Sequence, residues 1–206
     1  MLSPTTNFIL LIIFGYLLGS IPWGYLISKA KIIDIRKIGS GSIGVTNVLR
    51  ILGLKWAALV SILDVVKGVI PAYLAINFLV FDWQIALVAI SPILGHIFPV
   101  WLKFKGGKGV STTLGVLFIL LGWKFFLILL SSWLLILAIS QIMSFTNLLL
   151  ASFFPLILWF SSFSLAYYIF GIILAILIWW THRENLQRIK EGREPKFKLK
   201  KTISPT

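Results

Sequence analysis

The sequence predicts an all-α protein that crosses a membrane several times. Of its 206 residues, 59 % are apolar and only 12 % are charged. A water-soluble domain of this length needs more polar residues to cover its surface. Several apolar runs reach the ~20 residues that a helix needs to cross a bilayer. The first of them, residues 8–28, contains no charged side chain.

Each crossing is expected to be a helix, because backbone polar groups cannot bond to water inside a bilayer. Seven apolar segments qualify, at residues of about 6–28, 55–80, 83–102, 109–122, 124–142, 145–162 and 164–181. The stretch 110–140 is too long for one upright helix, and Gly122, Trp123 and Lys124 in its middle predict a tight turn. We therefore expect seven spans, rather than six, in one transmembrane domain covering residues 1–206.

Basic residues predict the orientation of these spans. Of nineteen Lys and Arg residues, five lie in 29–50, three in 103–108 and eight in 183–201. With seven spans and the N-terminus outside, all three segments and the C-terminus face the cytoplasm, as the positive-inside rule requires. Six spans would place the tail opposite the other two segments. No basic residue precedes the first span and no cleavage site stands out, so we expect a retained helix rather than a signal peptide.

The formal net charge of +13 and the absence of cysteine limit the kinds of site and binding partner that the chain can have. Without cysteine the chain cannot form disulfides, thiolate metal sites or a cysteine nucleophile. A soluble protein this basic would suggest nucleic acid. Here cytoplasmic loops that meet anionic lipid headgroups explain the charge. We expect membrane lipids as partners and no nucleic acid.

The first polar island is RKIGSGSIGVTNVLR, residues 36–50. It contains glycines, small hydrogen-bonding side chains and a closing arginine: Gly39, Ser40, Gly41, Ser42, Gly44, Thr46, Asn47 and Arg50. Glycines let backbone N–H groups converge on an anion, and arginine suits phosphate. The spacing also fits a dinucleotide fingerprint, but that motif needs a strand before it. We favour a phosphate site over the alternative of a flexible interfacial loop.

The second island is GHIFPVWLKFKGGKGVST, residues 95–112. Gly106, Gly107 and Gly109 surround Lys108, and an apolar helix follows. Backbone donors, a lysine and a helix N-terminus resemble the parts of a phosphate loop. The motif is not a Walker A sequence, because Lys108 is followed by glycine. The alternative is that the lysines of this island only fix the topology.

The third island, THRENLQRIKEGRE, covers residues 181–194. His182 and Asn185 are three residues apart and share a helix face. An ordinary amphipathic helix end is an equally good interpretation. Within the second span, Asp64 and Lys67 are expected to form a structural ion pair.

The three islands, in this order and at this spacing, resemble the bacterial acyl-phosphate:glycerol-3-phosphate acyltransferases, the PlsY family. The resemblance implies transfer of a fatty acyl group from acyl phosphate to the sn-1 hydroxyl of glycerol 3-phosphate. Lysophosphatidic acid and inorganic phosphate are the implied products, in the first acylation of phospholipid synthesis. It also implies seven spans in the bacterial plasma (inner) membrane and an active site facing the cytoplasm. No cofactor, no metal and activity as a monomer are expected.

The resemblance implies roles for particular residues. The catalytic set carried over is Ser40, Arg50, Lys108, His182 and Asn185. The implied substrate-binding residues are Gly39, Gly41, Gly44, Thr46, Asn47, Gly106, Gly107, Gly109 and Ser144. Asp64, Lys67 and Glu184 are implied to be structural. Ser42 departs from the family, which usually has asparagine there, so the fine positioning of substrate is in question.

The chemistry favours direct transfer without an acyl-enzyme, because acyl phosphate is already activated. Neither His96 nor His182 has an aspartate five residues later, as histidine bases of the other glycerol-phosphate acyltransferase class do. A substrate phosphate, with a second pKa of ~6, is an adequate base. We therefore expect the phosphate to take the proton and His182 to assist. The rival functions are a small transporter of phosphorylated solutes and a scaffold that only holds lipid headgroups.

Overall fold

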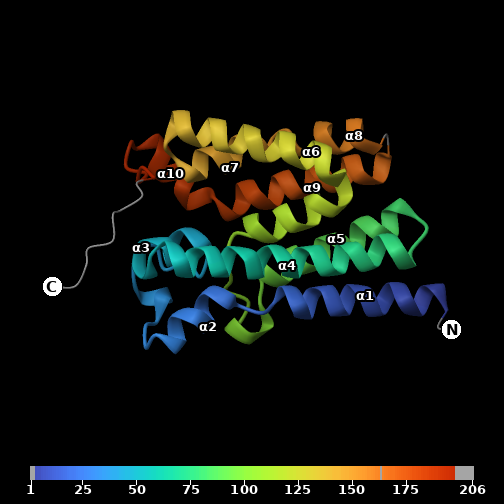
Figure 1. The fold of residues 1–206 in the computed structure, drawn as a ribbon, viewed down its shortest axis with the longest axis horizontal. Coiled ribbons are helices and arrows are strands. Elements are labelled where there is room, and N and C mark those ends of the chain that lie inside the picture. The colour runs from blue at the N-terminus through green and yellow to red at the C-terminus, as the bar shows by residue number, and fades with distance from the viewer. Residues whose placement is uncertain (1–2, 163, 198–206) are drawn as a thin grey trace.

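A computed structural model of the chain describes residues 3–162 and 164–197. The α-helices of this part are α1 (Pro4–Gly19), α2 (Trp23–Ala30), α3 (Val45–Leu52), α4 (Leu54–Phe78), α5 (Asp82–Ile97), α6 (Val110–Ser140), α7 (Met143–Ala151), α8 (Phe154–Ser162), α9 (Leu165–Thr181) and α10 (Arg183–Lys190). Two short 3₁₀ helices, η1 (Ile35–Lys37) and η2 (Val100–Leu102), lie in the loops. The all-α prediction is confirmed for the described residues (Figure 1).

By length and composition, four helical segments in the described ranges can each cross a membrane, namely 5–30, 54–78, 82–102 and 110–140. The number rises to six if the bent pairs α7–α8 (46°) and α9–α10 (61°) each count as one span. Large apolar side chains cover the outside of these helices, as lipid contact requires. The chain is a multi-pass membrane protein, whereas the seven spans and their orientation stay predictions.

The first span is not one continuous helix. The segment predicted at 6–28 forms α1 and α2, which are separated by a short break before Trp23. Pro22 explains the break, because proline lacks an N–H group and keeps the preceding residue out of helical geometry. The carbonyl of Ile21 accepts a hydrogen bond of 3.0 Å from Lys67 Nζ in α4. The buried lysine thereby satisfies a carbonyl next to the break.

The long helix α6 changes direction at Gly122, inside the predicted turn. Gly122 has φ 70° and ψ 170°, which is not helical. The rings of Phe118 and Phe126 lie on either side of it with centroids 5.0 Å apart. Residues eight apart in a straight helix would be ~12 Å apart along the axis. The chain therefore turns back at Gly122, as Figure 1 shows.

Close helix packing in the centre of the molecule depends on small residues. A Cβ atom on Gly68 of α4 would overlap the carbonyl of Thr112, and one on Gly115 of α6 would overlap the carbonyl of Val65. Glycine at both positions lets the two backbones approach, as is common in membrane helices. The main buried apolar cluster joins α4, α5, α6, α7, α8 and α9. This packing holds the start of α6 firmly against α4.

A smaller buried cluster supports the first polar island. Ile35, Ile43 and Val48 pack there against Ala57 and Val60 of α4. In Figure 1, α2, α3 and α10 lie at the end of the bundle opposite the start of α1. The first and third polar islands therefore lie at one end of the molecule.

Candidate active site

A cavity of ≈ 300 Å³ opens where the three islands meet. Nine of the residues implied to be catalytic or substrate-binding line it: Ser40, Gly44, Thr46, Asn47, Arg50, Lys108, Gly109, Ser144 and Asn185. Asp64, implied to be structural, lines it too. Residues from α3, α4, α5, α6, α7 and α10 share this lining. The structure thus brings together predicted residues that are up to 145 positions apart in the sequence, Ser40 and Asn185.

The side-chain amide of Asn47 holds the loop of the first island together. Its Nδ2 donates to the carbonyls of Ile35, Ile38 and Ser42 at 3.2, 3.0 and 2.9 Å. Its Oδ1 accepts from the N–H of Ser40 at 3.0 Å. The amide of Asn47 is therefore occupied with holding the loop, rather than free for a ligand.

Backbone N–H groups in the glycine loop of the second island are also bonded within the protein. The N–H of Gly106 donates to the carbonyl of Ile97 at 3.1 Å, and that of Gly107 to the carbonyl of His96 at 3.0 Å. Neither glycine lines the cavity. These two N–H groups fix the loop, which places Lys108 at the cavity wall.

Two helices begin at the cavity. Gly44, Val45 and Thr46 at the start of α3 line it, as do Gly109 and Val110 at the start of α6. The first N–H groups of a helix have no partner inside the helix and carry partial positive charge. Two such ends beside Arg50 and Lys108 make the cavity suited to phosphate groups.

A hydrogen-bond network joins the second and third islands through Glu194, which our sequence predictions did not include. Lys108 Nζ donates to Asn185 Oδ1, and Asn185 Nδ2 donates to Glu194 Oε1 at 2.6 Å. Ser144 Oγ donates to the same carboxylate at 2.7 Å, and Arg188 Nε donates to it at 2.7 Å. Glu194 therefore occupies an anion position that is formed by residues of α7 and α10.

The pKa values of Lys108 and Glu194 in this network depend on their burial and on the neighbouring side chains. Burial lowers the pKa of Lys108 from 10.5 to about 8, and nearby Glu194 only partly opposes this effect. Burial alone would raise the pKa of Glu194, but hydrogen bonds from Ser144, Asn185 and Arg188 outweigh it and lower this pKa. At neutral pH the network therefore contains an ionised glutamate and a protonated lysine.

His182 lies behind the cavity rather than on its wall. It is 1 % exposed, and its Nδ1 donates to the carbonyl of Ile178 at 2.8 Å. Burial, reinforced by the charge of Lys108, lowers the pKa of His182 to about 4. The ring is therefore neutral at physiological pH, with the proton on the nitrogen that faces Ile178.

The buried ion pair lies at the back of the site. Asp64 Oδ1 is 2.8 Å from Lys67 Nζ and 3.6 Å from His96 Nδ1. Thr112 Oγ1 lies 3.3 Å from the same His96 nitrogen. Asp64 and His96 both line the cavity, whereas Lys67 does not. This cluster links α4, α5 and α6 directly beneath the glycine loop.

Several predicted residues lie away from the cavity wall: Gly39, Gly41, Gly106, Gly107, His182, Lys67 and Glu184. Other polar residues that we did not predict line it: Ser61, His96, Ser111, Trp133, Asn147, Arg188 and Glu194. The sequence offered a signal for Glu194, which ends the third island and is one of only six acidic residues. It offered none for Asn147, which lies in an apolar helix.

We predict that Gly107→Ala destabilises the protein. A Cβ atom at Gly107 would overlap the imidazole of His96, which is itself packed among buried residues. Overpacking of this kind costs ~1–3 kcal/mol of stability. Thermal unfolding in detergent should show a lower midpoint for Gly107→Ala. Gly44→Ala is the matched comparison for stability, because its Cβ would meet only Ser42 Oγ at 3.4 Å. An unchanged midpoint for Gly107→Ala would contradict the tight loop.

The fold and the site define a multi-pass membrane protein with a cavity whose lining includes Arg50, Lys108 and two helix N-termini. Residues 9–192 match the profile of the family described as glycerol-3-phosphate acyltransferase. Relatives named glycerol-3-phosphate acyltransferase are 43 % identical in Prochlorococcus marinus strain NATL1A and 39 % identical in Aquifex aeolicus strain VF5. These alignments cover 92 % and 91 % of this chain, and 98 % and 97 % of the relatives. The chain belongs to this family.

Two solved structures show the same fold. They are crystal structures of PlsY (YgiH), an integral membrane glycerol 3-phosphate acyltransferase, in its glycerol 3-phosphate form and its lysophosphatidic acid form. Their TM-scores are 0.88 and 0.86, each at 38 % identity over 93 % of this chain and 96 % of the solved chain. The resemblance to the PlsY family noted from the polar islands is thereby confirmed.

Proposed function

We propose that this protein transfers a fatty acyl group from acyl phosphate to the sn-1 hydroxyl of glycerol 3-phosphate, forming lysophosphatidic acid and inorganic phosphate. The observation that carries the proposal is the single cavity in which two helix N-termini, Arg50 and Lys108 converge. Two anionic substrates repel each other, so a site that joins them needs several positive groups. The family membership and the ligands in the names of the two solved structures support glycerol 3-phosphate as one substrate.

The substrate phosphates occupy the two helix ends in this proposal. One phosphate lies at the start of α3 beside Arg50, whose guanidinium has no hydrogen-bond partner among the described side chains. The other lies at the start of α6 beside Lys108. The site acts by holding the hydroxyl near the carbonyl carbon and by neutralising charge.

The transfer is direct. The hydroxyl oxygen of glycerol 3-phosphate bonds to the carbonyl carbon, and the bond from that carbon to the phosphate oxygen breaks. Phosphate leaves with the electron pair, and a substrate phosphate takes the hydroxyl proton. In support, Ser40 Oγ has no hydrogen-bond partner within 3–162 and 164–197, so no neighbouring base activates it as a nucleophile.

The donor is tested with purified protein in detergent or lipid. Glycerol 3-phosphate is offered with palmitoyl phosphate, palmitoyl-CoA or palmitoyl-acyl carrier protein in parallel reactions. Lysophosphatidic acid should form with palmitoyl phosphate, whereas both thioesters should give none. Transfer from a thioester alone would overturn the acyl-phosphate proposal.

We predict that His182→Ala retains substantial turnover. His182 is neutral, buried and absent from the cavity wall, so its loss should not remove the base that takes the hydroxyl proton. A reduction of ~10-fold in kcat is expected, below the 10²–10⁴-fold that a general base contributes. Steady-state kinetics of a folded variant measure this. Complete loss of turnover, with normal binding of glycerol 3-phosphate, would assign the base to His182.

We further propose seven spans, with the N-terminus outside and the cavity facing the cytoplasm of a bacterial inner membrane. Counting the two pieces of α6 separately gives seven apolar segments when each bent pair is one span. The first and third polar islands lie at one end of the bundle and share a cavity with Lys108 and Gly109 of the second, which supports a site at one membrane face. The transporter alternative places polar residues near the membrane midplane instead. The protein acts as a monomer in this proposal, without cofactor or metal.

A further inference from the structure

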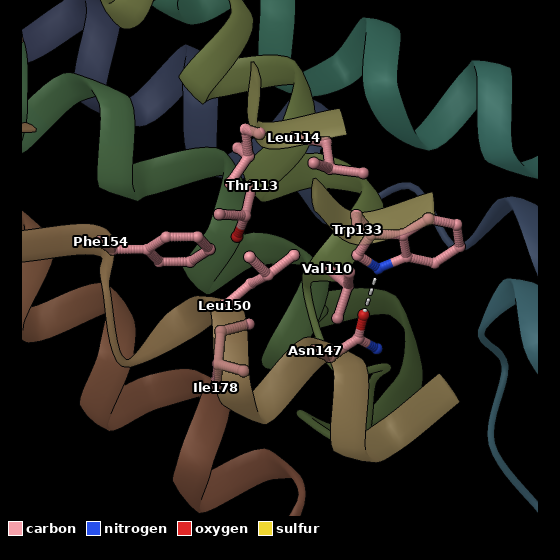
Figure 2. A pocket seen from close by; sticks show the side chains of 9 residues that line it. Val110, Thr113, Leu114, Trp133, Asn147, Leu150, Phe154 and Ile178 are labelled. Carbon is pink, nitrogen blue, oxygen red and sulfur yellow. Dashed lines mark hydrogen bonds between the residues drawn. The ribbon is translucent and has the colours of Figure 1, made fainter. Parts of the chain in front are cut away.

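The polar cavity adjoins a second hollow with a different character. This small apolar pocket of ≈ 20 Å³ is lined by Val110, Thr113, Leu114, Leu129, Trp133, Asn147, Leu150, Phe154 and Ile178 (Figure 2). Four of these residues also line the polar cavity: Val110, Leu114, Trp133 and Asn147. They form the boundary between the two hollows. An acyl phosphate likewise has a polar part and an apolar part, because its carbonyl group joins a phosphate to an apolar chain.

Only one side-chain donor is available at this boundary. Val110 and Leu114 carry no polar side-chain atoms, and Trp133 Nε1 already donates to Asn147 Oδ1 at 2.9 Å. Asn147 Nδ2 has no hydrogen-bond partner in the described part of the chain. Its two hydrogens are therefore free for a ligand that lies across the boundary.

The orientation of the Asn147 amide follows from chemistry. An indole N–H can only donate, so the atom of Asn147 that faces Trp133 must be the oxygen. The nitrogen then faces away from the indole, as Figure 2 shows. Because Trp133 lies on α6 and Asn147 on α7, two packed helices hold the donor in place.

Asn147 lies on α7 close to a residue of the charged network around Glu194. Ser144, which binds Glu194, lies three residues earlier and so shares a face of the helix with Asn147. The rise between them is ~4.5 Å along the axis. Asn147 therefore lies one turn of α7 beyond the charged network, at the boundary with the apolar pocket.

We propose that Asn147 is a catalytic residue whose Nδ2 donates a hydrogen bond to the carbonyl oxygen of the acyl donor, and that Trp133 is its positioning residue. This oxygen gains negative charge as the hydroxyl adds to the carbonyl carbon, and a fixed amide donor stabilises it. The charge returns to the carbonyl bond when the phosphate leaves. This inference rests on the acyl transfer proposed above, but not on the identity of the base.

Kinetic measurements on three variants test the proposal. Asn147→Asp keeps the shape and the acceptor for Trp133 but removes the donor, whereas Asn147→Leu removes both. Each should lower kcat by ~100-fold or more, the usual effect of losing such a donor, while the KM for glycerol 3-phosphate changes less than twofold. Trp133→Phe should cause a smaller loss of kcat. If Asn147→Leu fails to fold, Asn147→Asp still decides the question.

A spectroscopic measurement separates a catalytic role from a structural one. Palmitoyl phosphonate labelled with ¹³C at the carbonyl cannot transfer its acyl group, and a hydrogen bond lowers its carbonyl stretching frequency. The infrared band of the bound label should shift to higher frequency in Asn147→Leu. Asn77→Leu, which makes the same change at an exposed site at the far end of α4, should leave kcat and the band unchanged.

The outcomes distinguish this proposal from the proposed function. A folded Asn147→Asp with wild-type kcat, or an unshifted carbonyl band, overturns the role of Asn147 while acyl transfer stands. A large loss of kcat in Thr113→Val, with none in Asn147→Asp, would assign the donor to the buried Thr113 hydroxyl, which has no partner among the described residues. Absence of transfer by the wild-type protein overturns the function itself.

Discussion

Replacing Lys108 by methionine should reduce kcat/KM for glycerol 3-phosphate by ~100-fold or more, the scale of losing one charge that stabilises the transition state. Lys108 is the cationic end of the network through Asn185 to Glu194, and it lies where α6 begins. Methionine keeps the length of the side chain but removes its charge. Purified variants assayed with acyl phosphate and glycerol 3-phosphate give the measurement.

Lys105→Met is the matched control, because Lys105 belongs to the same loop but is exposed and does not line the cavity. It should keep kcat/KM within about twofold, as surface substitutions usually do. Equal losses in both variants would indicate that loop charge acts only through topology or lipid contact.

The pH profile gives a second test of the same lysine. The pKa of Lys108 is lowered to about 8, so the free protein loses this positive charge as the pH rises through about 8. Affinity for the phosphate substrates should therefore fall above pH 8, and kcat/KM should fall with it. In Lys108→Arg the charge persists, so the alkaline decline should move to higher pH even if turnover is slower. An identical decline in that variant would assign it to another group.

Replacing Asn185 by leucine should abolish most activity and also destabilise the protein. Asn185 is buried, accepts from Lys108 and donates to Glu194. Leucine fills similar space but leaves both charged groups without this partner. An unsatisfied buried polar group costs ~1–3 kcal/mol, and more when it is charged. The thermal midpoint and kcat/KM should therefore fall together.

Gln187→Leu provides the control for Asn185→Leu, since it makes the same type of change on the exposed face of α10. Its only side-chain contact in the described structure is with Glu191 at 3.3 Å. Stability and activity should stay close to wild type. A stable, active Asn185→Leu protein would contradict the central place of Asn185 in the site.

The sequence predicted the elements that depend on local composition. Apolar runs gave the helical segments, and Gly122 marked the reversal inside α6 because glycine tolerates its φ of 70°. The division of the last spans was harder to predict. The bend between α7 and α8 lies just before Pro155, the second residue of α8, because proline cannot continue the helix from α7. The sequence therefore contained a signal for this bend, which the prediction of one span at 145–162 did not use.

The candidate site was less predictable, because a motif does not show which donors the loop uses internally. Gly106 and Gly107 have the composition of a phosphate loop, yet their N–H groups bond to carbonyls of α5. Asn47 likewise holds its own loop. Asn147 is hidden in an apolar helix, and only the fold brings it to the cavity beside Trp133.

The central claim is that acyl phosphate reacts directly with glycerol 3-phosphate in the assembled cavity. Rapid-quench measurement of phosphate release tests it, with acyl phosphate mixed first with the protein alone and glycerol 3-phosphate added later. We expect no phosphate before the second addition, and then phosphate and lysophosphatidic acid in equal amounts. A burst of one phosphate per protein before glycerol 3-phosphate is added, with the acyl group recovered on Ser40, would contradict direct transfer.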